Sequence, residues 1–341
     1  MSTNSGQDSE AIPHDEQQHI DSLIASLRGK MEKDYASKRM LRDAHPKMHA
    51  CVKAEFTVDA DLPADLAVGL FAKPQSYQTW VRFSNAASDV SPDIKGDIRG
   101  IGLKLMGVPG EKLLPDQTDC LNQDFLLISY DRFIARNVAE FDGLVKGLVG
   151  SPIRLILFML THLRVAYLTI KSLQKVASVL DIHYFSAVPY LLGDKAVKYV
   201  LIPKQVDSSQ IPDDPSDNYL GEELIKRLGE QSVVYDFAVQ LQADKAEQPI
   251  EDPTVVWEED VSPFRKVATL TLLQQSYNPA DRQDFGDNLS FNPWRCTAEH
   301  KPLGGFGRAR KQVYMALSKF RHERNKVPQS EPKVDGKHWK E

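Results

Sequence analysis

The sequence predicts an α+β protein built on an antiparallel β-barrel, with a helical insertion and a C-terminal helix. Several short segments are rich in β-branched and aromatic residues and are bounded by turn formers, which is typical of strands. Some are joined by short links, whereas one long link is apolar and helix-like. Such a series favours a closed antiparallel barrel. Barrels with helical additions often reach this size as one unit, so we expect a single domain over residues 16–324.

The N-terminal part is predicted to be a polar tail followed by an amphipathic helix. Residues 1–15 are rich in Ser, Gln, Asp and Asn, so we expect them to be disordered. From Glu16 to Lys33 the apolar residues recur at intervals of three and four, which indicates a helix. They are Ile20, Leu23, Ile24, Leu27 and Met31. We expect the segment 16–37 to pack across the body as a helical arm.

The predicted strands follow in two groups, before and after the insertion. They are Cys51–Val58, Thr79–Ser84, Gly100–Met106 and Phe125–Ser129, and then Ala196–Ile202, Ser232–Gln242 and Phe264–Leu273. Near the C-terminus, Phe306–Arg324 reads as a basic helix, and 325–341 is predicted to be a polar tail.

The insertion, residues 137–180, is predicted to be helical, and its middle, residues 152–170, is strongly apolar. A bilayer span needs about 20 mostly apolar residues, and Arg154, His162 and Arg164 interrupt this segment. We therefore expect no transmembrane helix. Two interpretations stay open: a hairpin buried against the barrel or in a homodimer contact, and a surface that touches lipid or admits an apolar substrate.

Composition excludes several classes of protein. The 341 residues include 42 Lys+Arg and 47 Asp+Glu without a basic block, so no nucleic-acid partner is expected. The three cysteines lack CxxC spacing, and the first twenty residues lack an apolar run, so we expect a cytoplasmic protein. Phosphate-binding and dinucleotide-binding glycine loops are also absent.

Three groups of residues could carry chemistry. The first, Arg42 to His49, contains two histidines four residues apart, at His45 and His49, but Pro46 stands where a zinc protease has glutamate. A metal pair is therefore only weakly indicated, and a structural histidine is the default. In the second, strand alternation places Arg82 and Ser84 on one face. This face is either a solvated outer wall or an inward wall where the guanidinium binds an anion.

The third group is Arg310 and Tyr314, which neighbour each other if the segment is helical. An adjacent guanidinium favours the charged phenolate, which is a hard oxygen ligand for ferric iron. On its own this spacing is common.

Together these groups resemble the catalase superfamily, and more closely its short catalase-related haem proteins. The resemblance covers roughly Lys38 to Arg324. It depends on Arg42-x-x-His45, the run from His49 to Phe56, Arg82-Phe83-Ser84, Asp97-Ile98-Arg99-Gly100 and Arg310-x-x-x-Tyr314, in this order.

The resemblance implies a catalase-like β-barrel that binds haem b. Tyr314 would then be the axial ligand of the iron, and His45 the distal acid and base, with Ser84 as its hydrogen-bond partner. Arg42 and Arg82 would lie near the propionates, and Arg310 would hold the tyrosinate anionic. In the family an asparagine follows the strand that resembles Asp124–Ser129, and this register places Ile128 or Ser129 there. Ser129 could replace the amide as a weaker donor, and Asn122 would do so only if the strand were shifted.

The resemblance therefore predicts a haem peroxidase that uses an unidentified reductant. Ala44 and Ala86 stand where catalases carry larger residues, so organic or fatty-acid hydroperoxides are expected substrates besides hydrogen peroxide. Two alternatives are an allene oxide synthase-like hydroperoxide dehydratase and a haem-binding protein without turnover. A lipid-carrying barrel without haem is a third.

Overall fold

The strands form one antiparallel sheet that closes into an eight-stranded barrel. This computed structural model describes residues 10–207 and 209–340. The sheet closes because the short β5 pairs with β4 through Phe185 and Ile128 and with β7 through Tyr184 and Leu201. The ninth strand, β6, extends β7 at the edge. The strands are β1 (Met48–Val58), β2 (Ser76–Asn85), β3 (Arg99–Met106), β4 (Asn122–Ile128), β5 (Tyr184–Phe185), β6 (Tyr190–Leu192), β7 (Lys195–Pro203), β8 (Val233–Leu241) and β9 (Arg265–Leu272).

Large apolar side chains fill the interior of the barrel. Val81 and Phe83 point inward and join the main core. Phe237 lies at its centre, with ring centroids 5.1 Å from Phe56 and 5.0 Å from Phe125. A barrel of eight strands is just wide enough for side chains to fill it. The interior is therefore a hydrophobic core.

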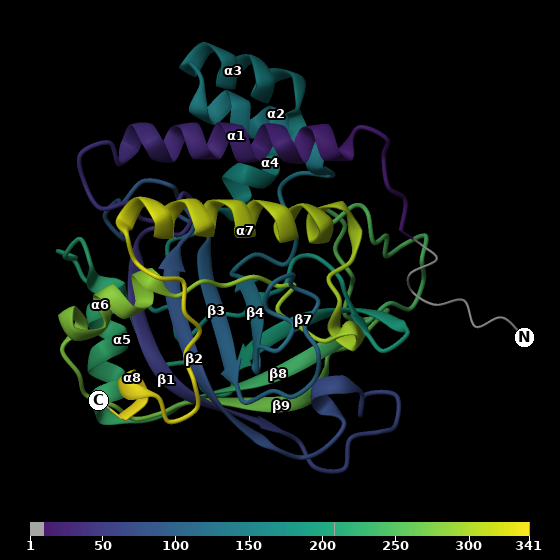
Figure 1. The fold of residues 1–341 in the computed structure, drawn as a ribbon, viewed down its shortest axis with the longest axis vertical. Coiled ribbons are helices and arrows are strands. Elements are labelled where there is room, and N and C mark those ends of the chain that lie inside the picture. Colours follow the sequence, from purple (N-terminus) through teal and green to yellow (C-terminus); the bar gives the residue numbers. More distant parts are fainter. Residues whose placement is uncertain (1–9, 208, 341) are drawn as a thin grey trace, which may run out of the picture.

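The helices lie outside the barrel. Figure 1 shows α7 running across the sheet with α1 parallel above it. Apolar residues of α1, α2 and α7 pack together, among them Ile20, Val138 and Val313. The predicted N-terminal arm therefore packs on these two helices. The helices are α1 (Glu16–Asp34), α2 (Val138–Val149), α3 (Pro152–Thr161), α4 (Leu163–Ser172), α5 (Tyr219–Glu230), α6 (Pro279–Asn288), α7 (Gly304–Asn325) and α8 (Lys337–Lys340).

The structure confirms the fold class and the positions of the seven predicted strands. It adds β5 and β6, whose two and three residues are too few to show alternation, and the helices α5 and α6. Of the predicted tail 1–15, residues 1–9 lie outside the described residues, whereas Glu10 pairs with Lys301 and Arg308.

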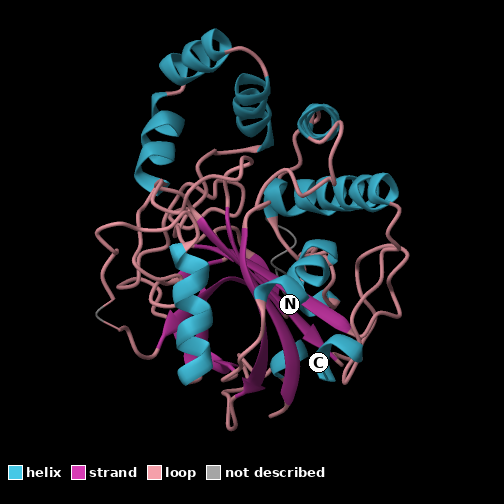
Figure 2. Ribbon diagram, turned by 90° about the vertical axis from the view of Figure 1, so that its left-hand side faces the viewer, coloured by secondary structure: helices cyan, strands magenta, loops and turns pink. Residues whose placement is uncertain are grey.

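The insertion is helical, as predicted, but its outer helix α3 is not buried against the barrel, whereas Val165 and Leu168 of α4 are buried. None of the ten residues of α3 is buried, and Figure 2 shows these helices projecting from the body. Within the described chain, no single helix is long and apolar enough to cross a membrane. Only α3 and α4 taken together meet that test of length and composition, and they bend by 107° at their junction.

Candidate active site

His45 lies in the loop that leads into β1, and several contacts fix its position. Its backbone takes a left-handed conformation, with φ of 62°. Its N–H donates to Ala86 O over 3.3 Å, and Arg82 Nη2 donates to its carbonyl over 3.0 Å. Its ring shares a 3.0 Å hydrogen bond between Nδ1 and Ser84 Oγ. Two predicted site residues of β2 thus hold the loop and the imidazole.

The face of β2 that carries Arg82 and Ser84 points away from the core of the barrel, and yet both side chains are buried. Neither interpretation from the sequence was right, since this wall is neither inward nor solvated. Segments that follow β9 cover it: Asp287 Oδ1 of α6 lies 3.9 Å from Arg82 Nη2. The candidate site therefore lies between the outer face of the sheet and the C-terminal helices.

Gly100 makes room for the His45 ring on this face. It pairs with Ser84 across β2 and β3. A Cβ at this position would lie only 2.4 Å from His45 Cε1 and 2.5 Å from Nδ1. On the next strand, β4, Ile128 pairs with Gly100, so Ser84, Gly100 and Ile128 are neighbours across three strands. The imidazole therefore rests on bare backbone, and its neighbour on β4 is aliphatic.

The imidazole of His45 is neutral at physiological pH. Its pKa is lowered to about 3, mainly by burial and then by the charges of Arg82, Arg42 and Arg310 in that order. The structure thus gathers the four predicted side chains within electrostatic reach of one another. A neutral imidazole can accept a proton, as a general base must.

Arg42, Arg82 and Arg321 form a buried cluster that is short of negative charge. Burial lowers the pKa of all three, and repulsion by Arg82 lowers the pKa of the other two further, that of Arg321 to about 10. Arg42 donates to the carbonyl of Gly286 at 3.2 Å and to that of Leu289, and Arg321 donates to the carbonyl of Asp287. Arg82 Nε is buried without a hydrogen-bond partner. This cluster suits a ligand that carries two carboxylates.

Arg321 was missed by the sequence reasoning. It lies on α7, seven residues and about two helical turns after Tyr314, so the two share a side of the helix. That spacing was the available signal, but the partners of Arg321 lie on a distant segment.

Arg310 and Tyr314 are neighbours on α7, as predicted. The guanidinium carbon of Arg310 lies 5.2 Å from the centroid of the Tyr314 ring. Arg310 Nη1 also donates to the hydroxyl of Tyr190 on β6 over 3.3 Å. Burial opposes the charge of Arg310, but the Tyr314 and Tyr190 hydroxyls outweigh it and raise its pKa above the usual value. Arg310 is therefore a permanent cation between two phenols, and Tyr190 is a second residue that the sequence reasoning missed.

Neither Ser129 nor Asn122 is a hydrogen-bond partner of His45. Ser129 Oγ accepts a 2.8 Å hydrogen bond from Arg99 N, just beyond the end of β4. Asn122 begins the same strand, and its amide donates to Pro332 O over 2.9 Å and to Glu331 over 3.2 Å. Because the pair Gly100 and Ile128 lies at the other end of β4, Asn122 is remote from the candidate site.

His49 does not join His45 in a metal site. Its Nε2 shares a 2.7 Å hydrogen bond with Asn85, and its Nδ1 lies 3.7 Å from Asp93. Within the described part of the chain, no three His, Cys, Asp or Glu side chains are grouped so that they could hold a metal ion.

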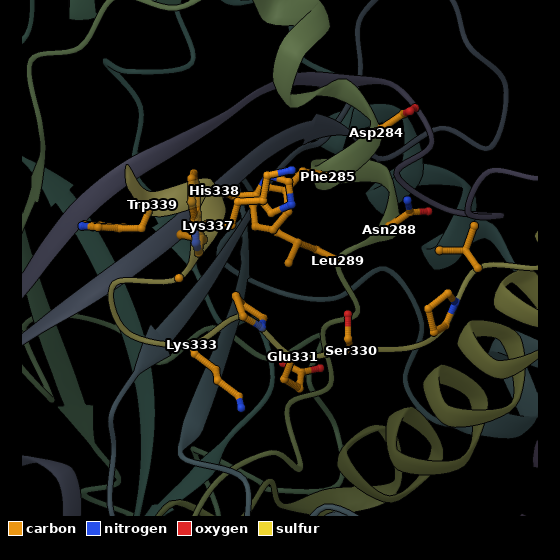
Figure 3. Close-up of a pocket in the computed structure, with 15 residues that line it drawn as sticks. Asp284, Phe285, Asn288, Leu289, Ser330, Glu331, Lys333, Lys337, His338 and Trp339 are labelled. Carbon is orange, nitrogen blue, oxygen red and sulfur yellow. The ribbon is translucent and has the colours of Figure 1, made fainter. Parts of the chain in front are cut away.

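A separate cleft of about 470 Å³ lies between β2, α6 and the C-terminal segment (Figure 3). Trp80, Phe285, His338 and Trp339 line it, and none of the predicted site residues does. The ring centroids of Trp80 and Trp339 are 5.4 Å apart, so this cleft is where the end of the chain docks on the sheet.

Comparison with known proteins identifies the architecture. The chain matches no family model and no curated protein. Among solved structures it is similar to a bacterial catalase, with a TM-score of 0.67 and 15% identity over 99% of this chain and 68% of that one. A fungal catalase has a TM-score of 0.63 and 15% identity over 96% of this chain and 65% of that one. Catalase A from Saccharomyces cerevisiae has a TM-score of 0.63 and 16% identity, with coverage of 96% and 68%.

The chain has a catalase-like fold. It spans about two thirds of the length of these catalases. At such identities the similarity shows the fold alone, so the functional argument must come from the residues. They fit haem: a phenol oxygen beside a guanidinium is a ligand for ferric iron, the arginine cluster lacks the two carboxylates that haem propionates supply, and a neutral histidine lies within electrostatic reach of both.

Proposed function

We propose that this protein is a haem-dependent hydroperoxide-metabolising enzyme, a peroxidase that acts on organic or fatty-acid hydroperoxides and on hydrogen peroxide. The observation that carries the proposal is the neutral His45, hydrogen-bonded to Ser84 over Gly100 and surrounded by arginines. A buried imidazole that stays uncharged among cations can accept a proton from a peroxide and return it.

Four arginines and Tyr314 would hold the cofactor. Tyr314 would provide the iron ligand, with the Arg310 guanidinium beside it. Arg42, Arg82 and Arg321 would bind the propionates and so receive the negative charge that the cluster lacks. When bound, haem supplies an iron centre that cleaves the O–O bond of a hydroperoxide.

His45 would move the proton. Ser84 Oγ holds one ring nitrogen, Nδ1, at 3.0 Å. When Nδ1–H donates to Ser84, the lone pair of Nε2 is free to take the hydroperoxide proton and to return it to the leaving oxygen. The low pKa of His45, about 3, keeps this lone pair available throughout the physiological range of pH.

The row of residues beside His45 favours organic hydroperoxides over hydrogen peroxide. Ile128 occupies the position on β4 next to Gly100, and the nearby Ser129 hydroxyl already accepts a hydrogen bond from the backbone. No amide is held there to orient a small polar peroxide, whereas an aliphatic side chain suits an alkyl group. We therefore propose that disproportionation of hydrogen peroxide is slow relative to turnover of cumene hydroperoxide.

The test is the ultraviolet-visible spectrum of protein expressed with added haem precursor, before and after mixing with cumene hydroperoxide. We expect a ferric high-spin Soret band that changes on mixing, and loss of its tyrosinate features in Tyr314→Phe. Turnover with a chromogenic phenol as reductant should fall by about 10²–10⁴ in His45→Ala. The exposed His14→Ala serves as the control.

Two results would overturn the proposal. One is a protein that binds no haem at any loading. The other is a haem-loaded His45→Ala variant that turns over at the wild-type rate, which would remove His45 from the mechanism.

A further inference from the structure

We propose that α3 and α4 form a docking surface for an anionic lipid bilayer. The surface, called the α3–α4 face below, consists of large apolar side chains that project from the two helices, each 56–72% exposed. They are Ile153, Ile156, Leu157, Leu160, Leu163, Tyr167 and Ile170. Large apolar side chains that are exposed on two successive helices indicate an interaction surface.

The α3–α4 face is preformed and stands clear of the body. Figures 1 and 2 show α3 at the outer end of the helical projection, beyond α1 and α2. Glycines on α2 let α3 pack closely: a Cβ at Gly143 would lie 2.7 Å from the Phe158 ring, and one at Gly147 would lie 3.2 Å from Leu155. On α4, Val165 and Leu168 are buried toward the body, which leaves the apolar residues of the other side outward. The apolar surface is therefore fixed in place and has no cover among the described residues.

The charges around this face select its partner. From Gly143 to Leu180 the chain contains no Asp or Glu, although the whole chain carries a net charge of −5. The same segment carries the basic residues Lys146, Arg154, Arg164, Lys171 and Lys175. Amphipathic helices with basic residues beside an apolar side lie in the headgroup region of anionic membranes. The Lys171 ammonium lies 5.9 Å from the centre of the Tyr167 ring, an aromatic and cationic pair of the kind found at membrane interfaces.

A second copy of the chain is a poorer partner for this face. In a two-fold dimer the same patch faces itself, so these basic residues would meet their own copies without any acidic residue of the segment between them. The two helices are also too short to span a bilayer, and they bend by 107°. Both observations favour a bilayer surface on which each helix lies flat.

Vesicle sedimentation tests the proposal, with the purified full chain and vesicles of phosphatidylcholine alone or with about one-quarter phosphatidylglycerol. We expect binding to the anionic vesicles only. The variant Ile156→Ser/Leu160→Ser should weaken that binding at least about tenfold, because it removes two side chains that the lipid would bury. Both positions are exposed, so the fold should be unaffected. The control is Val90→Ser/Val206→Ser, which removes equally exposed apolar side chains elsewhere.

A charge variant provides the second arm. Arg154→Glu/Lys171→Glu should abolish the preference for anionic vesicles, whereas Lys319→Glu on the exposed side of α7 should not. Absence of binding to either vesicle would overturn the proposal, and so would equal binding by Ile156→Ser/Leu160→Ser. A dimer in sedimentation velocity that this variant disperses, without vesicle binding by the wild type, would assign the face to a second copy. None of these measurements depends on haem or turnover, so they can fail independently of the proposed function.

Discussion

Replacing Gly100 by alanine should disable His45 without removing any functional group. The new Cβ would lie 2.4 Å and 2.5 Å from two ring atoms of His45, whereas ordinary contact begins near 3.4 Å. The ring must therefore retreat by about 1 Å, which would break its 3.0 Å hydrogen bond to Ser84. A misplacement of about 1 Å at a reacting group costs about 10²-fold in rate, or about 2.7 kcal/mol of transition-state stabilisation.

The assay is kcat/KM for cumene hydroperoxide, measured on protein whose haem content is matched by its Soret absorbance. We expect Gly100→Ala to load haem like the wild type and to lose about 100-fold in kcat/KM. Gly102→Ala is the matched control, because it lies on the same face of β3 but would meet the Phe291 ring at 3.2 Å. A Gly100→Ala enzyme within about twofold of the wild type, or an equal loss in Gly102→Ala, would show that the position of His45 does not limit the reaction.

Three further variants test the charges. Arg321→Met should release haem to apomyoglobin at least about tenfold faster because a propionate partner is lost, whereas the exposed Lys319→Met should not. Burial lowers the pKa of His300 to about 4, so as the pH falls the unfolded chain binds a proton at this histidine before the folded chain does. The contribution of His300 to the free energy of unfolding is therefore complete above pH 6.5 and is lost between pH 6.5 and 4. Urea titrations should show about 2 kcal/mol less acid destabilisation between pH 7.5 and 5 in His300→Gln than in the wild type. Asp124→Ala removes a carboxylate that pairs with the buried Lys104 and Arg295, and should lower the free energy of unfolding by about 3–5 kcal/mol in the same urea titrations. Asp65→Ala, which removes the partner of Arg265 at the surface, should lower it far less.

Local pattern was enough to predict most of the barrel. Alternation along strands such as Ser76–Asn85 reflects one face that meets the core, so their positions could be predicted within a few residues. The closure of the barrel through Tyr184 and Phe185 could not be predicted, because a strand of two residues is too short to show alternation of polar and apolar side chains. The sequence of α6, PADRQDFGDN, has no apolar side, so its cover over Arg82 was also invisible.

The sequence predicted most residues of the candidate site, but not which segments cover them. Alternation shows that Arg82 and Ser84 share a face, but not what lies over that face, and here the cover comes from segments some two hundred positions away in the sequence. The lack of negative charge around Arg321 and its two neighbouring arginines also results from contacts between segments far apart in the sequence. Tyr190 likewise meets Arg310 only because the short β6 pairs with Pro302, just before α7 begins.

The pairing of β1 with β9 sets the order in which this molecule can be completed. Ala54 pairs with Leu272, so the first strand lacks one neighbour until the last strand, more than two hundred residues later, has been made. Tyr314 and Arg321 leave the ribosome later still. A chain that is made from its N-terminus therefore holds His45, Arg42 and Arg82 without Tyr314, Arg310 and Arg321 until α7 has been made. Any prosthetic group held by both sets must enter after α7 has been made and closes over the face of the sheet.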